Sequence, residues 1–149
     1  MIASILIIVF SAVLFVYWFR YTCLLILSTK TTKDYTSLVA SANQLELLET
    51  QESLRMGVEP ERLDGLRASL ENDYRVLTSL LRHAAEFQIG GYNIEQRMLM
   101  VDFACMQLWY GVCRRFSQSQ AHQTLDEMSS IVSHFANAMG ERGAAISRS

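Results

Sequence analysis

The first residues of the chain are the feature that most limits how it can fold. Ile2 to Phe19 are eighteen consecutive positions without a charged side chain, and their only serines are Ser4 and Ser11. At about 1.5 Å per residue, this stretch forms a helix of roughly 27 Å, which is close to the thickness of a bilayer core. The sequence therefore predicts a transmembrane anchor over residues 1–28.

The end of the apolar run carries side chains that are typical of a membrane boundary. Arg20 is the first charge in the chain, and Tyr17, Trp18 and Tyr21 surround it. Tyrosine and tryptophan are enriched where the bilayer meets water, and a long arginine side chain at a helix end can reach the headgroups. We expect these four residues to anchor the helix at the membrane interface.

Three alternatives agree less well with this segment than a transmembrane anchor does. They are a cleaved signal peptide, a lipoprotein signal and a soluble buried helix. A cleaved signal peptide needs basic residues before its apolar part and a small-x-small cleavage site, and neither occurs here. The residues before Cys23 lack the apolar and small pattern of a lipidated cysteine. A soluble buried helix is disfavoured because a 149-residue chain rarely covers eighteen residues that are apolar on every side.

The charges near the anchor predict its orientation. Arg20, Lys30 and Lys33 all follow the apolar run, and no lysine or arginine precedes it. Basic residues favour the cytoplasmic side. We therefore expect an uncleaved signal-anchor, a single pass through the plasma (inner) membrane, an N-terminus outside and a cytoplasmic C-terminal domain.

The cysteines agree with a reducing compartment. Three cysteines are an odd number. Cys105 and Cys113 are separated by about 12 Å along one predicted helix, which is too far for a disulfide. We expect both thiols to be reduced and buried.

The remainder of the chain has the composition of an all-α domain. After Arg20, 12 lysines and arginines face 15 aspartates and glutamates, so a basic footprint for nucleic acid is absent. Strand-like alternation is missing, and the whole chain has one proline. We predict an antiparallel bundle of about four helices over residues 34–140. Residues 29–33 would form a short linker or a helical continuation, and residues 141–149 a flexible tail.

Periodic apolar residues and capping patterns place the four helices. The first runs from 34 to about 56 and stops at Gly57, and the second runs from Pro60 to Gly90-Gly91. Capping boxes at Asn93/Gln96 and Thr124/Glu127 begin the third and fourth helices, and Gly140 ends the fourth.

The third helix is unusual because residues 98–113 are apolar on all sides except at Asp102, Gln107 and Gly111. A helix of this kind is either buried or inserted in a membrane. Its sixteen residues extend only about 24 Å and include a carboxylate, so a second span is disfavoured. We expect the central helix of the bundle, with Asp102 paired to Arg75 or Arg82. A dimer interface or a membrane-surface contact through Trp109 and Phe116 would explain any surplus apolar side.

Catalytic and metal-binding patterns are absent from the sequence. His83, His122 and His134 fall on separate segments without metal-ligand spacing, and no phosphate-binding loop or nucleophile motif occurs. We therefore expect no metal or cofactor, and an enzyme is less favoured than a binding protein.

The function predicted from these features is that of a non-enzymatic, single-span membrane protein. Its cytoplasmic helical domain would be an interaction or scaffold module that binds a protein partner or a second copy. The alternative is a bundle that binds a small apolar ligand or a redox cofactor around four residues of the third helix. These residues are Asp102, Cys105, Trp109 and Cys113.

Overall fold

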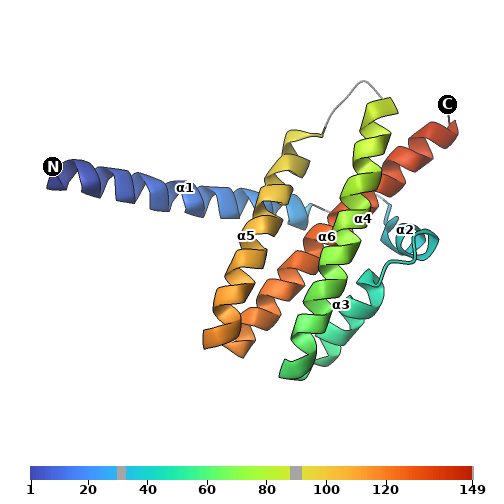
Figure 1. The fold of residues 1–149 in the computed structure, drawn as a ribbon. Coiled ribbons are helices and arrows are strands. Elements are labelled where there is room, and N and C mark those ends of the chain that lie inside the picture. The colour runs from blue at the N-terminus through green and yellow to red at the C-terminus, as the bar shows by residue number, and fades with distance from the viewer. Residues whose placement is uncertain (30–32, 88–91, 149) are drawn as a thin grey trace. The chain divides into compact units, whose positions relative to one another are not determined.

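The computed structural model describes residues 1–29, 33–87 and 92–148, and these residues form helices, turns and no strand. They divide into two compact units, residues 1–30 and 31–149. The first unit is α1 (Ile2–Ser28), and the second contains the remaining helices (Figure 1). The all-α class and the bundle-like packing of the C-terminal helices are as the sequence predicts.

The helix α1 is one continuous helix of 27 residues. It is the one helix among the described residues that is long and apolar enough to cross a membrane, with a mean hydropathy of 2.6 over its most apolar window. At about 1.5 Å per residue it extends roughly 40 Å, which is longer than the roughly 30 Å hydrocarbon core of a bilayer. The predicted linker 29–33 falls largely on residues 30–32, which lie outside the described residues.

The helical unit is built around α6 (Gln118–Arg148). It packs against α2 (Thr36–Ala42), α3 (Leu47–Met56), α4 (Leu63–Phe87) and α5 (Ile94–Phe116). A short 3₁₀ turn, η1 (Pro60–Arg62), leads into α4. The prediction that the third helix is central is wrong, because that place belongs to the fourth helix. Being apolar on every side does not distinguish a central helix from a peripheral one with an exposed apolar face.

Aromatic side chains connect the three long helices of this unit. The ring of Tyr74 on α4 stacks on Phe103 of α5, with centroids 3.9 Å apart and planes within 8°. Tyr74 also meets Phe135 of α6 edge to face at 5.8 Å. Phe103 and Phe135 are fully buried, so this cluster forms part of the core.

The first predicted helix is two helices, so the prediction of one helix over 34–56 is wrong. After α2 ends at Ala42, Asn43 donates its side-chain amide to the Val39 carbonyl at 2.9 Å, and Gln44 has a φ of 54°. The Asp73 carboxyl of α4 is buried near the backbone of Glu46 and Leu47, and its Oδ2 atom makes no hydrogen bond within the described residues. From this position Asp73 can cap the start of α3.

The last helix is longer than predicted at both ends. Ser117 is the single residue between α5 and α6, in an extended conformation, and its hydroxyl accepts the Gln120 N–H at 3.5 Å. Thr124 lies inside the helix and donates to the Gln120 carbonyl at 2.8 Å, so the predicted capping box there is wrong. Gly140 does not end the helix either, because α6 continues to Arg148.

Several predicted boundaries agree with the structure. Asn93 precedes α5, and its N–H donates to the Gln96 side chain at 3.4 Å, as a capping box requires. Gly57 ends α3 with a φ of 84°. The predicted end of the second helix at Gly90-Gly91 lies outside the described residues.

Candidate interaction surface on α5

The helix α5 has a buried face that fixes it to the bundle. The side chains of this face are apolar or aromatic except for two polar groups, and they are less than a tenth exposed. They are Gln96, Leu99, Asp102, Phe103, Met106, Tyr110 and Cys113. They recur every three or four residues, so they form one side of the helix.

The opposite side of α5 is exposed and also apolar. Leu108 is 77% exposed and Phe116 is 84% exposed, and Trp109, Val101 and Val112 each expose about half of their surface. We call the whole set the α5 apolar face: Val101, Ala104, Cys105, Leu108, Trp109, Gly111, Val112 and Phe116. From Val101 to Val112 no exposed residue of this helix is charged. A continuous apolar surface of this kind is typical of an interaction site.

Two exposed arginines lie at the ends of this face. Arg97 and Arg115 are eighteen residues apart, which is five full helical turns, so they project in the same direction about 27 Å apart. Ala104 and Gly111 lie between them on the same line. The one exposed acid of α5, Glu95, lies in the first turn at the other edge of the helix.

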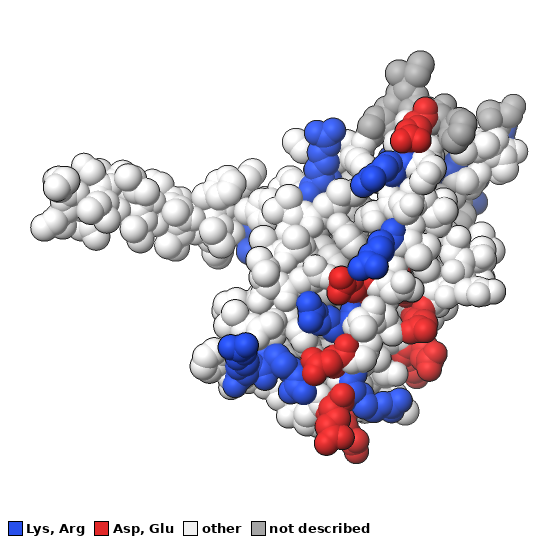
Figure 2. Space-filling model, viewed as in Figure 1, with Lys and Arg blue, Asp and Glu red and all other residues white. Residues whose placement is uncertain are grey.

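Figure 2 shows the same pattern on the surface. The atoms over the middle of α5 are white, with Lys or Arg side chains near both of its ends. Charged side chains of both signs lie instead over α4. The α5 apolar face is therefore bordered by cations, within a domain that carries more acids than bases.

The four residues of the predicted α5 pocket differ in their exposure. Asp102 and Cys113 are buried, whereas Cys105 and Trp109 belong to the exposed face. The prediction that Cys105 is buried is wrong, since only the Cys113 thiol lies in the core. Their spacing of three, four and four residues places all four along one stripe of α5, at the border between its buried and exposed sides. A ligand site along this stripe stays a prediction.

The structure places the predicted arginine partners of Asp102 on α4. Arg75 pairs with Glu71, one turn away on its own helix, at 3.3 Å, and its side chain is 76% exposed. Its exposure and this local pair make Arg75 a surface residue. Asp102 itself is 1% exposed and lies on the side of α5 that faces the bundle.

The predicted membrane-interface residues all lie in the second half of α1. Tyr17, Trp18 and Tyr21 are 54–70% exposed, and Arg20 lies among them. Thr22 donates its hydroxyl to the Trp18 carbonyl at 2.9 Å, which satisfies a polar group within the helix. Their role at a membrane interface stays a prediction.

A polar contact near η1 holds the last turns of α5 against α4. The Tyr110 hydroxyl donates to Asp64 at 2.7 Å, and Arg114 reaches Asp64 at 3.4 Å and the Pro60 carbonyl at 2.9 Å. Burial, followed by the Asp64 carboxylate, raises the pKa of Tyr110 to about 12. The same hydrogen bond lowers the pKa of Asp64 below its ordinary value. Arg114 therefore makes its contacts inside the domain, at the border between α5 and α4.

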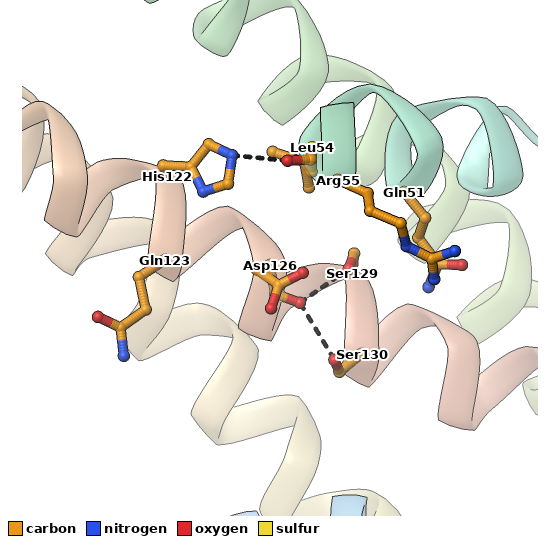
Figure 3. A pocket seen from close by; sticks show the side chains of 8 residues that line it. All are labelled: Gln51, Leu54, Arg55, His122, Gln123, Asp126, Ser129 and Ser130. Carbon is orange, nitrogen blue, oxygen red and sulfur yellow. Dashed lines mark hydrogen bonds between the residues drawn. The ribbon is translucent and has the colours of Figure 1, made fainter. Parts of the chain in front are cut away.

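A polar hollow lies between α3 and α6. Its volume is about 500 Å³, and its lining residues are Gln51, Leu54, Arg55, His122, Gln123, Asp126, Ser129 and Ser130 (Figure 3). His122 binds the Leu54 carbonyl in the last turn of α3 at 2.9 Å. Ser129 and Ser130 both donate to the backbone carbonyl of Asp126.

This hollow does not have the geometry of a nucleophilic site. Each serine hydroxyl uses its proton on a carbonyl of its own helix, and the imidazole of His122 is directed at Leu54 rather than at a serine (Figure 3). A serine nucleophile needs an adjacent base that accepts its proton. The hollow can instead receive polar groups of another molecule.

His83 lies on α4, whereas His122 and His134 both lie on α6, so the prediction that the three histidines fall on separate segments is wrong. His83 binds the Ser79 carbonyl one turn earlier, at 2.8 Å. Burial lowers the pKa of His134, against the opposing effects of Glu95 and Glu141. Over the part of the chain that the structure describes, no three His, Cys, Asp or Glu side chains are grouped as a metal site would require.

Comparison with protein families, curated proteins and solved structures found no match to this chain. A function for it therefore rests on its helices and surfaces. Sequence reasoning allowed for a surplus apolar side on this helix, but it missed that α5 is peripheral and exposes the whole α5 apolar face. Gly111, inside this helix, was the available signal. Glycine weakens a helix, and because no atom lies within 4 Å of the place its Cβ would take, close packing against the bundle does not explain a glycine there.

Proposed function

We propose that the protein is a non-enzymatic, single-span membrane protein whose helical domain is an interaction module held at the bilayer. The observation that carries this proposal is α1, a helix of 27 residues without an acidic side chain, joined to a separate compact unit. The absence of a charged residue before Arg20 supports insertion of α1, and the basic residues after it favour a cytoplasmic domain.

The helical domain offers two surfaces for binding. One is the α5 apolar face, and the other is the polar hollow between α3 and α6. Figure 1 draws α5 and α3 on opposite sides of α6, so both surfaces can be used at once. A protein partner or a second copy of the chain is the proposed ligand at the polar hollow, and nucleic acid is disfavoured by the excess of acidic residues.

Topology is tested with single cysteines in a variant that lacks Cys23, Cys105 and Cys113. Cysteines introduced at Glu52, Gln118 and Ser149 should not react with an impermeant maleimide on intact cells, and all three should react after the cells are opened. Reaction of all three in intact cells would reverse the orientation. Reaction at Ser149 but not at Glu52 would show that the membrane is crossed a second time after Glu52.

The interaction role is tested separately by cross-linking in native membranes. Photoreactive residues placed at Gln51 and Gln123, which border the polar hollow, should form a defined adduct with another protein or with a second copy. A photoreactive residue in place of Arg75, which is exposed on α4, serves as the control. A protein that stays monomeric and without adducts from either hollow position would contradict the scaffold role.

A further inference from the structure

We propose that the α5 apolar face binds the surface of a bilayer that contains anionic lipids, so that the helical domain lies on the membrane through α5. This inference rests on the proposed function in one respect, because α1 has to hold the domain near the bilayer. It adds a second membrane contact, made by a different helix and by different residues.

The residues of the face have the chemistry of an interfacial helix. Its bulky side chains, Leu108, Trp109, Val112 and Phe116, are apolar or aromatic, and its outer edge ends in Arg97 and Arg115. A helix that lies in the interface buries its apolar side among the upper acyl chains while its cations meet the phosphates. Tryptophan is especially suited to this depth.

Charge complementarity also orients the domain. The arginines border an exposed surface without acids between Val101 and Val112, whereas the region that follows Arg20 has 12 basic and 15 acidic residues. An anionic surface therefore attracts the two ends of the α5 apolar face and repels the more acidic remainder of the domain. Each arginine near such a surface contributes about 1 kcal/mol, which is about a fivefold change in binding.

The same arginines disfavour a second copy as the occupant. In an antiparallel contact centred near residue 106, Arg97 would face the partner's Arg115, because the two are almost equally far from the centre. In a parallel contact each arginine would approach its own counterpart. Juxtaposed like charges suppress an interface of this kind.

A short tether makes even a weak contact effective. Seven residues separate Ser28, the end of α1, from Thr36, the start of α2, and a chain of this length spans at most about 25 Å. With α1 in the bilayer, the docking of α5 becomes an intramolecular step at a high effective concentration. One helical face can then suffice, although it would bind free vesicles weakly.

The two tryptophans of the chain allow the anchor and the α5 contact to be tested independently. Trp18→Phe leaves Trp109 as the only tryptophan, and Trp109→Phe leaves Trp18. Each full-length variant is reconstituted at high lipid excess into phosphatidylcholine vesicles with and without phosphatidylglycerol, and quenching by lipids brominated on their acyl chains is measured. We expect Trp109 to be quenched in the anionic vesicles, and less so without phosphatidylglycerol or at high salt.

Charge variants provide the matched control. In the Trp18→Phe background, Arg97→Gln and Arg115→Gln should each lower the ratio of docked to undocked domain about fivefold. Arg75→Gln removes an exposed arginine of α4 that lies away from this face, and it should leave the ratio unchanged. Leu108→Asp, at a side chain that is 77% exposed, should abolish docking without unfolding the domain, as circular dichroism can verify.

The outcomes separate the two proposals. If Trp18 is quenched and Trp109 is not, the anchor stands and the α5 inference is overturned. If neither is quenched, both fail. Shielding of Trp109 that appears only at high protein density, or only when another protein is added, would assign the face to a second copy or to a protein partner and would likewise overturn the inference.

Discussion

Gly140 of α6 lies directly against Tyr35, the residue before α2. A methyl group at Gly140 would overlap the Tyr35 Cβ and come within 2.7 Å of its Cγ. One turn earlier on α6, the Asn137 side-chain oxygen accepts the Tyr35 N–H at 2.7 Å. Together these contacts fix the point where the chain enters the helical domain, and they explain a glycine inside a helix.

Gly140→Ala is therefore expected to destabilise the domain. Overpacking at a close contact costs typically 1–3 kcal/mol, which exceeds the roughly 1 kcal/mol that alanine gains in helix propensity. The measurement is the free energy of unfolding of the full-length protein in mild detergent. Gly143→Ala is the control, because nothing lies within 4 Å of a Cβ there, and it should be neutral or stabilising. Equal effects of the two substitutions would contradict the assigned contact.

Asp73 should be replaceable by asparagine but not by alanine. Asp73 is buried near the backbone of Glu46 and Leu47, at the start of α3. Asparagine keeps an oxygen that can accept N–H groups there, whereas alanine removes it, at an expected cost of about 1 kcal/mol. Chemical denaturation at pH 7 compares the two variants with the wild type. If Asp73→Ala were as stable as Asp73→Asn, the capping role would be refuted.

The Asp73 carboxyl should make the free energy of unfolding depend on pH in the acidic range. Burial raises the pKa of Asp73 above its ordinary 3.8, and the Glu46 carboxylate also raises this pKa, whereas the nearby backbone N–H groups of Glu46 and Leu47 lower it. The folded state therefore binds the proton more tightly, so this group adds stability as the pH falls through its raised pKa toward 3.8. Asp73→Asn should remove that part of the pH profile, as denaturation across this range would measure.

Tyr110 should ionise at unusually high pH. Because its folded pKa is raised to about 12, the contribution of this group to stability is complete below pH 10 and is lost between pH 10 and about 12. In a tyrosinate absorbance titration, Tyr110→Phe should remove a component near pH 12. Tyr92→Phe is the control, and it should leave that component in place. Loss of the component from Tyr92→Phe instead would show that Tyr110 is not its source.

His122 should stabilise the end of α3. Its ring nitrogen is 2.9 Å from the Leu54 carbonyl, so His122→Ala should cost about 0.5–1.5 kcal/mol in unfolding free energy. Gln123→Ala changes an exposed neighbour in the same hollow and should stay within about 0.5 kcal/mol of the wild type. Equal losses for both variants would show that the contact contributes nothing specific.

The sequence by itself determined the features that depend on neighbouring residues. The apolar run of α1, the capping box before α5 and the glycine after α3 each act within a few residues, and the structure has all three helices at these places. The all-α class follows from the same local patterns, because helical spacing and capping residues are set within one or two turns.

The tertiary structure decided what depends on residues far apart in the chain. Asp73 is buried beside the start of α3, which is a different helix from its own. Gly140 is small because Tyr35 lies against it rather than because a helix ends there. Only packing revealed that α6 is central and that α5 has neighbours on one side, which leaves half of its apolar surface exposed. Hydrophobic periodicity records that a face is apolar, but what covers that face is set by contacts that the linear sequence does not contain.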